Sequence, residues 1–174
     1  MARNVEVKAR VRDTCAFRRR VESMSDTTVE VLEQRDTFFV VPRGRLKLRV
    51  LASGDCELIC YERPDDARAK LSEYFVVRAS EPEAFLELLS AVLEVRGVVA
   101  KRRFLYRIGR TRVHLDEVEG LGTFMELEVV LDENESAEEG RAVAERLSAE
   151  LGIEDEDRVS GAYIDLLERV RSGS

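Results

Sequence analysis

The sequence predicts an α+β protein built on an antiparallel sheet, and three observations favour this class. Several segments alternate apolar and polar residues with a period of two, as half-buried strands do. Short turn segments separate consecutive strands, which is the connection that antiparallel pairs use. Further segments carry apolar residues at helical spacing, and two of them follow a capping-box pattern.

The first half of the chain begins with a strand at residues 4–12, in which every second residue is apolar. Residues 14–24 carry apolar residues at helical spacing, and residues 29–41 return to β-branched and aromatic residues. Turn residues at 42–44 precede another strand at 45–50, so these two strands should form a hairpin. The strands that complete the first sheet are at residues 56–64 and 70–79.

A helix at residues 83–93 divides the chain, and Ser80 with Glu83 forms a capping-box pattern in front of it. The strand pattern then restarts. A second capping box, Ser136 with Glu139, precedes a helix at 137–151. The other elements of this half are strands at residues 98–108, 110–118 and 122–131 and a last helix at 160–170.

Composition narrows the class of protein. A chain of 174 residues can bury a core without disulfides or a structural metal, so we expect one domain over residues 1–174. Three cysteines and one histidine make a poor disulfide framework and a poor zinc site, which favours a cytoplasmic protein. The net charge of -7 argues against nucleic acid as a partner. No apolar run approaches the length that spans a bilayer, so no membrane partner is expected.

The polar faces of the predicted strands carry charge of one sign over whole strands. Lys47 and Arg49 share one face, whereas Glu126 and Glu128 form an acidic pair. These faces could be the solvated outside of an ordinary antiparallel sheet. Alternatively, an anion and a metal ion lie between the like charges, which otherwise repel across neighbouring strands. Period two places on one face Glu6, Lys8, Arg10, Lys47, Arg49, Tyr61, Arg63, Lys101, Arg103, Arg112, His114, Asp116, Glu126 and Glu128.

The order of several short motifs resembles the CYTH superfamily, the triphosphate tunnel metalloenzymes. The motifs are VEVK at 5–8, DTFF at 36–39, LKLR at 46–49, YERP at 61–64, HLDEVEGLG at 114–122 and FMELE at 124–128. The resemblance extends from Val5 to about Leu167 and is strongest to the CyaB-like class IV adenylyl cyclase and thiamine triphosphatase branch. It implies a closed antiparallel β-barrel of about eight strands, with helices packed outside and a tunnel lined by polar side chains.

The first strand departs from the family signature E-x-E-x-K at one position. Glu6 and Lys8 match the signature, but Asn4 stands where the family has its first glutamate. Asparagine can offer an amide oxygen to a hard cation but brings no charge. The change therefore bears on metal affinity and on the number of metal ions held.

The acidic pair has the spacing of a metal site. Glu126 and Glu128 lie two positions apart on one strand, so their carboxylates point the same way, about 7 Å apart. Mg²⁺ is commonly held by one or two carboxylates together with substrate phosphates, and Mn²⁺ is a possible substitute. An exposed acidic edge is the structural alternative. With the residues that the resemblance adds, the predicted metal ligands are Glu6, Asp116, Glu126 and Glu128.

The cationic residues have the chemistry of a triphosphate site. Arginine matches phosphate with its planar fork, and lysine adds a compact charge. His114 could orient a ligand or assist proton transfer, although a single histidine on a strand can also be structural. The predicted triphosphate-binding residues are Lys8, Lys47, Arg49, Arg63, Lys101, Arg103 and Arg112, and the predicted catalytic residues are Lys8, Arg63, Lys101 and His114.

Three functions remain open from the sequence. The first is a Mg²⁺-dependent enzyme that converts ATP to cyclic AMP and pyrophosphate, as a class IV adenylyl cyclase does. The second is hydrolysis of thiamine triphosphate, tripolyphosphate or a nucleoside triphosphate in the same tunnel. The third is a binder of polyphosphate or nucleotide without catalysis. The expected partner is a small-molecule triphosphate, and the chain is expected to be a monomer or a homodimer.

Overall fold

The computed structural model describes residues 2–62 and 68–173. Its strands form a closed barrel in the order β1-β5-β4-β3-β2-β6-β7-β8, in which every neighbouring pair is antiparallel. The strands are β1 (Ala2–Arg10), β2 (Glu30–Phe39), β3 (Arg45–Leu51), β4 (Cys56–Glu62), β5 (Lys70–Ala79), β6 (Val95–Ile108), β7 (Thr111–Val118) and β8 (Gly122–Val130). The helices are α1 (Thr14–Met24), α2 (Pro82–Val92), α3 (Ala137–Glu150) and α4 (Tyr163–Arg171), with a short 3₁₀ turn at Asp155–Asp157.

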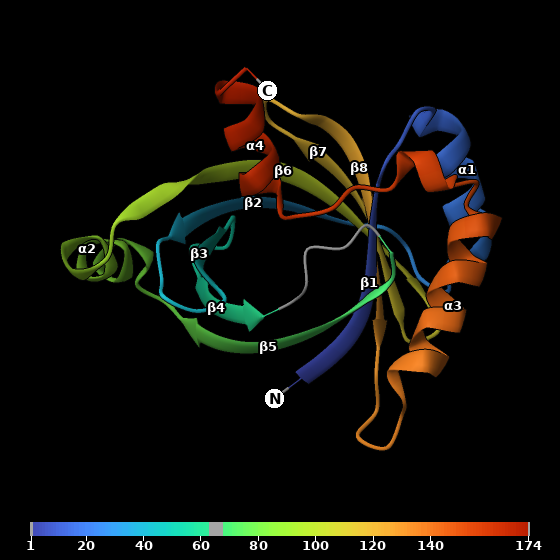
Figure 1. Ribbon diagram of the computed structural model, residues 1–174, viewed down its shortest axis with the longest axis horizontal. Helices are drawn as coiled ribbons and strands as arrows, with labels where there is room; N and C mark the ends of the chain where they lie inside the picture. Colours follow the sequence, from blue (N-terminus) through green and yellow to red (C-terminus); the bar gives the residue numbers. More distant parts are fainter. Residues whose placement is uncertain (1, 63–67, 174) are drawn as a thin grey trace.

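The helices lie outside the barrel, so the predicted fold class is confirmed (Figure 1). β1 closes the ring because it pairs with β5 along one edge and with β8 along the other. The two faces of this strand therefore lie in different surroundings. Val5, Val7 and Ala9 are buried in the outer core, whereas Asn4, Glu6 and Lys8 line the interior.

Three apolar clusters fix the helices to the barrel, two of them on its outer surface. The first joins α1 and α3 to β1, β7 and β8. A Cβ atom at Gly140 of α3 would lie 2.8 Å from Cγ2 of Val5, so a glycine is needed where this helix meets β1. The second cluster joins α4 to β2, β6, β7 and β8, and its members Phe38, Val99 and Tyr163 also line the barrel interior. The third joins α2 to the outer face of β2, β3 and β4.

The two predicted helix starts have different outcomes. The capping box before α3 is confirmed, because the Glu139 amide donates to Ser136 Oγ and the Ser136 amide donates to Glu139 Oε2. The capping box before α2 is wrong. Glu81 is the N-cap and Pro82 is the first helical residue, a position where proline fits because the first helical amide has no partner within the helix.

The described residues also bear on two expectations from composition. Cys15, Cys56 and Cys60 are free thiols. Within residues 2–62 and 68–173, no helix is both long enough and apolar enough to cross a membrane.

Candidate active site

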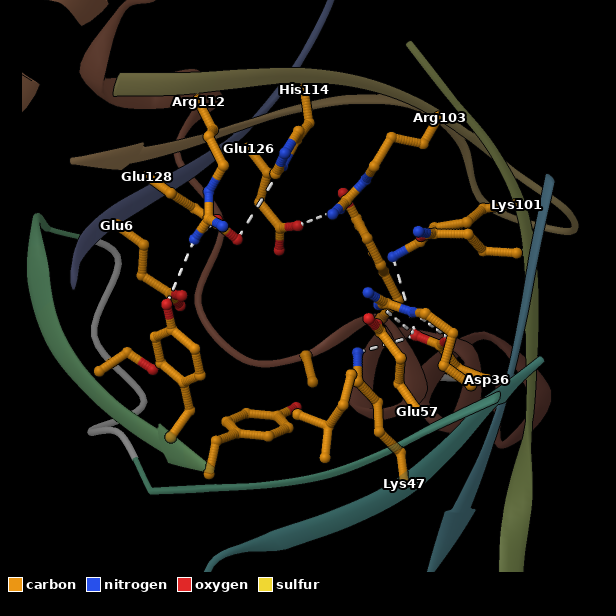
Figure 2. A pocket seen from close by; sticks show the side chains of 18 of the residues that line it. Glu6, Asp36, Lys47, Glu57, Lys101, Arg103, Arg112, His114, Glu126 and Glu128 are labelled. Atoms are coloured by element: carbon orange, nitrogen blue, oxygen red, sulfur yellow. Dashed lines mark hydrogen bonds and ion pairs between the residues drawn. The ribbon is translucent and has the colours of Figure 1, made fainter. Parts of the chain in front are cut away.

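The barrel encloses a cavity of about 560 Å³ that receives side chains from all eight strands (Figure 2). This volume lies within the range of roughly 300–1,000 Å³ that small-molecule sites occupy. The predicted residue Arg63 lies outside the described part of the chain. The predicted residues that line the cavity are Glu6, Lys8, Lys47, Arg49, Lys101, Arg103, Arg112, His114, Glu126 and Glu128.

One side of the cavity is cationic and is organised by Asp36 of β2. Arg49 donates from Nε to Asp36 Oδ1 at 2.7 Å and from its terminal nitrogen to Oδ2 at 2.9 Å. Lys47 Nζ lies 2.8 Å from the same Oδ2 atom, and Lys101 Nζ lies 3.8 Å from it. Asp36 is only 1% exposed, so a buried carboxylate fixes Lys47 and Arg49 through hydrogen bonds and lies close to Lys101.

A second buried carboxylate, Asp116 of β7, positions Arg103. Arg103 donates to both carboxylate oxygens, at 2.7 and 2.6 Å, and the Tyr163 hydroxyl donates to Oδ2 at 2.9 Å. The sequence predicts Asp116 as a metal ligand. The structure places it against Arg103 and Tyr163 and apart from the cluster that Glu126 and Glu128 form with His114.

The opposite side of the cavity is acidic and comes from β1, β7 and β8 (Figure 2). The register pairs Glu6 with Glu128 across β1 and β8, and His114 with Glu126 across β7 and β8. Ligand atoms of His114, Glu126 and Glu128 all lie within 4.8 Å of one another. Glu126 and Glu128 also contact cations: Lys8 and Arg103 lie 3.0 and 2.5 Å from Glu126, and Arg112 lies 2.8 Å from Glu128.

The buried charges shift the pKa values of several of these groups. Burial and the nearby charge of Arg103 lower the pKa of Lys101 to about 7 and that of His114 to about 4. Burial alone would raise the pKa of Asp36, but Arg49, Lys47 and Lys101 hold it well below the ordinary value. His114 is therefore neutral at neutral pH, and Lys101 is poised between its two charge states.

The start of α4 contributes Tyr163 to the cavity wall. Lys8 Nζ lies 3.9 Å from the centre of the Tyr163 ring, and Lys101 Nζ lies 5.2 Å from it. The helix start is held by Asp165, which accepts hydrogen bonds from the Ala162 amide, Arg45 and Arg96. Tyr163 thus connects the C-terminal helix to both lysines and to Asp116.

Asp36 and Tyr163 are site residues that the sequence reasoning missed. The DTFF motif contains Asp36, and period two places this residue on the same face as Gln34 and Phe38, which also line the cavity. That alternation was the available signal. Tyr163 lies on a helix far along the chain, and no pattern in its neighbourhood predicts contact with the strands.

The acidic side of the cavity has the donor atoms of a site for a divalent cation. Glu6, Glu126 and Glu128 supply the oxygen ligands that Mg²⁺ and Mn²⁺ prefer. Within the described residues, Asn4 Oδ1 and His114 Nδ1 are buried atoms with no hydrogen-bond partner. These donor types fit a divalent metal, and Asn4 keeps an oxygen where the signature has glutamate.

The comparisons with known proteins agree with this geometry. The family model described as CYTH domain matches residues 2–163. The chain belongs to the CYTH domain family. Members of this family are in general enzymes that bind small triphosphates, and its triphosphate tunnel metalloenzymes use a divalent metal ion.

Individual relatives of this CYTH protein cover almost its whole length. The adenylate cyclase CyaB of Aeromonas hydrophila is 25% identical over an alignment of 175 positions, which covers 95% of this chain and 88% of the relative. The solved structure of the PH1012 protein from Pyrococcus horikoshii OT3 is 28% identical, with a TM-score of 0.84 over 94% of this chain and 99% of that one. HpAC1 from Hippeastrum, described as having a dominant triphosphatase activity, shares the fold at 20% identity, with a TM-score of 0.65 over 98% and 96% of the two chains.

Proposed function

We propose that this CYTH protein is a divalent-metal-dependent enzyme that converts ATP to cyclic AMP and pyrophosphate in the barrel tunnel. The observation that carries the proposal is the division of the cavity into a cationic side organised by Asp36 and an acidic side formed by Glu126 and Glu128. A triphosphate needs cations along its length, and its metal needs carboxylates next to it. The similarity to CyaB over 95% of the chain supports the cyclase reaction.

The cationic side supplies a preorganised site for the phosphates. Because Asp36 fixes Lys47 and Arg49, these groups need little reorganisation when the anion enters. Arg103 is fixed in the same way by Asp116. In such a cavity, an ion pair at 4 Å is worth about 4 kcal/mol at an effective dielectric constant of about 20, compared with about 1 kcal/mol in water.

The acidic side would hold the metal through Glu126, Glu128 and Glu6. When bound, the metal would supply positive charge to the phosphate oxygens. The protein groups around it set the position of the triphosphate. Lys8 lies next to Glu126 and is almost fully buried, so it can contact phosphate oxygens near this side.

Cyclisation forms a bond between the ribose 3′ oxygen and the α-phosphorus and breaks the bond from that phosphorus to the pyrophosphate oxygen. Negative charge develops on the leaving pyrophosphate, and the proton of the 3′ hydroxyl ends on that pyrophosphate or in solvent water. Arg103 is a fixed cation that can stabilise this charge, and Lys101 can do so in its protonated form, which a bound triphosphate favours. His114 has a pKa of about 4, so it is a weak base at neutral pH.

Hydrolysis of a triphosphate is the second candidate, favoured by the activity described for HpAC1 on the same fold. It would use the same cations and metal ligands, with water attacking the γ-phosphorus in place of the ribose hydroxyl. Water needs no pocket of its own, whereas the ribose must be held in line. The two reactions therefore differ in which phosphorus faces the nucleophile.

Product analysis distinguishes these functions. The protein is incubated with ATP, thiamine triphosphate or tripolyphosphate and with Mg²⁺ or Mn²⁺, and the products are separated by chromatography. Cyclic AMP with pyrophosphate supports the cyclase, and ADP with phosphate supports the hydrolase. The Arg102→Ala variant is a control that should keep the wild-type activity. Arg102 lies between the tunnel residues Lys101 and Arg103 in the sequence, but it points to the outer surface and pairs with Glu33. Tight binding of triphosphate without turnover of any substrate would overturn both reactions in favour of a binder.

A further inference from the structure

His114 has an unusual environment for a structural histidine. Its side chain is 5% exposed, and within residues 2–62 and 68–173 its Nδ1 atom has no hydrogen-bond partner. A buried ring nitrogen without a partner is costly to keep, so a structural role would normally provide one. Glu128 Oε1 lies 3.9 Å from Nδ1, which is too far for a hydrogen bond.

The distances between the ligand atoms of His114 and the two glutamates are close to those between atoms that bind one metal ion. Metal bonds to imidazole nitrogen and carboxylate oxygen are about 2.0–2.2 Å long, so two ligand atoms on one ion lie at most about 4.3 Å apart. The separation of 3.9 Å between Nδ1 and Glu128 Oε1 fits within this limit. The ligand atoms of His114, Glu126 and Glu128 lie at most 4.8 Å apart, so they need to approach one another by only about half an ångström to bind one ion.

Glu128 presents its two oxygens to different partners. Oε2 lies 2.8 Å from Arg112, and Oε1 faces His114. A metal ion on Oε1 therefore leaves the Arg112 ion pair in place. Glu126 contacts Lys8 through Oε1 and Arg103 through Oε2, and each carboxylate oxygen has a second lone pair for the ion.

We propose that His114 Nδ1 is a direct ligand of the divalent metal, together with Glu126 and Glu128, and that the site consequently prefers transition-metal ions over Mg²⁺. This inference rests on the proposed function, because it concerns the metal of that same tunnel. Imidazole favours ions such as Co²⁺ and Zn²⁺, whereas Mg²⁺ favours an all-oxygen shell. With His114 as a ligand, Mn²⁺ and Co²⁺ should both bind more tightly than Mg²⁺.

The chain contains a single histidine, so a histidine signal can come only from this site. Untagged protein is titrated with Co²⁺ in the absence of substrate, and binding is followed by calorimetry and by proton NMR in water. Ligation through Nδ1 leaves the proton on Nε2, so one strongly shifted exchangeable ring resonance is expected at one equivalent of Co²⁺. The resonance should disappear in His114→Asn and be lost or weakened in Glu128→Gln.

The preference of the site between Mg²⁺ and Mn²⁺ is a second test of His114 as a ligand. His114→Asn places an amide oxygen near the position of Nδ1, so the ratio of the Mg²⁺ and Mn²⁺ dissociation constants should fall by about tenfold while Mg²⁺ still binds. Stoichiometric Co²⁺ binding without a shifted histidine resonance would overturn the inference and leave the proposed function intact. Failure of Co²⁺ to bind, with turnover supported by Mg²⁺, would do the same. Loss of all metal dependence of turnover would overturn the proposed function as well.

Discussion

Replacing Lys101 with methionine should make the protein more stable at neutral pH while weakening its binding of triphosphate. Lys101 is 6% exposed and lies among Asp36, Asp116, Arg49 and Arg103. Burial and the charge of Arg103 lower its pKa from 10.5 to about 7, although the two aspartates act in the opposite direction. Methionine has a similar unbranched chain and no charge to bury.

The size of the effect follows from the difference between the pKa of Lys101 in the folded chain and its pKa in the unfolded chain. Between about pH 7 and 10.5 the unfolded chain holds a proton on Lys101 that the folded chain releases, so this group makes stability rise with pH. A tenfold change in the acid dissociation constant corresponds to about 1.4 kcal/mol, so at pH 7 the buried lysine costs about 4 kcal/mol of folding stability. The cost falls below about 1 kcal/mol near pH 10.

Lys101→Met should therefore raise the free energy of unfolding by up to about 4 kcal/mol at pH 7 and raise the Tm by roughly 5–15 °C. The gain should fade by pH 10. Urea unfolding followed by circular dichroism at several pH values measures this, with Arg102→Met as the control. Arg102 is exposed on the same strand and pairs with Glu33, so its replacement should change stability by less than about 1 kcal/mol at any pH.

The same lysine should link triphosphate binding to proton uptake. The bound anion stabilises charged Lys101 and raises its pKa, so the wild-type protein should take up close to one proton when tripolyphosphate binds near pH 8.5. Calorimetry in buffers of different ionisation enthalpy measures this number, and Lys101→Met should lower both the proton uptake and the affinity. A variant that is less stable than wild type at pH 7, or a stability gain that does not depend on pH, would refute the reasoning.

Three further predictions concern carboxylates and their neighbours. Glu126→Gln should lower metal-dependent turnover by at least about 100-fold, measured by product chromatography; unchanged turnover that also survives EDTA would contradict the metal site. Asp36→Asn should destabilise the protein by about 3 kcal/mol, because Lys47 and Arg49 lose their buried partner. Tripolyphosphate should then raise the Tm of this variant more than it raises the Tm of the wild type. Equal increases in Tm would contradict the role of Asp36. Asn4→Glu should tighten metal binding in calorimetry, since it adds a carboxylate at the cavity wall, and weaker binding would show that Asn4 does not face the metal.

The elements of the fold were largely predictable because local patterns determine them. The strand at 70–79 and the helix at 14–24 have the predicted bounds, since the strand is rich in aromatic and β-branched residues and the helix has apolar residues at helical spacing. The start of α2 was mispredicted because a proline overrode a plausible capping box. Closure of the barrel depends on β1 pairing with both β5 and β8, which are far apart in sequence, so only the family resemblance implied it.

In six of the eight strands, alternation also predicted a polar face whose side chains line much of the cavity, whereas no such face was assigned on β2 or β5. Lys47, Arg49, Lys101 and Arg103 all lie on the wall, as period two requires. What the sequence could not supply was the pairing between strands. Register places Arg49 opposite Asp36 and Arg103 opposite Asp116, and this turns two carboxylates into anchors for cations.

These anchors explain how the tunnel can hold so many cations before a ligand binds. Without Asp36, the charges of Lys47, Arg49 and Lys101 would repel one another in a cavity that excludes most water. The aspartate neutralises part of that charge, but Lys101 remains poorly compensated, as its pKa of about 7 indicates. A bound triphosphate supplies the negative charge that balances the remaining positive charge. The charges that lower the stability of the ligand-free protein are therefore those that the ligand satisfies, so stability and triphosphate affinity should change in opposite directions both at Lys101 and at Asp36.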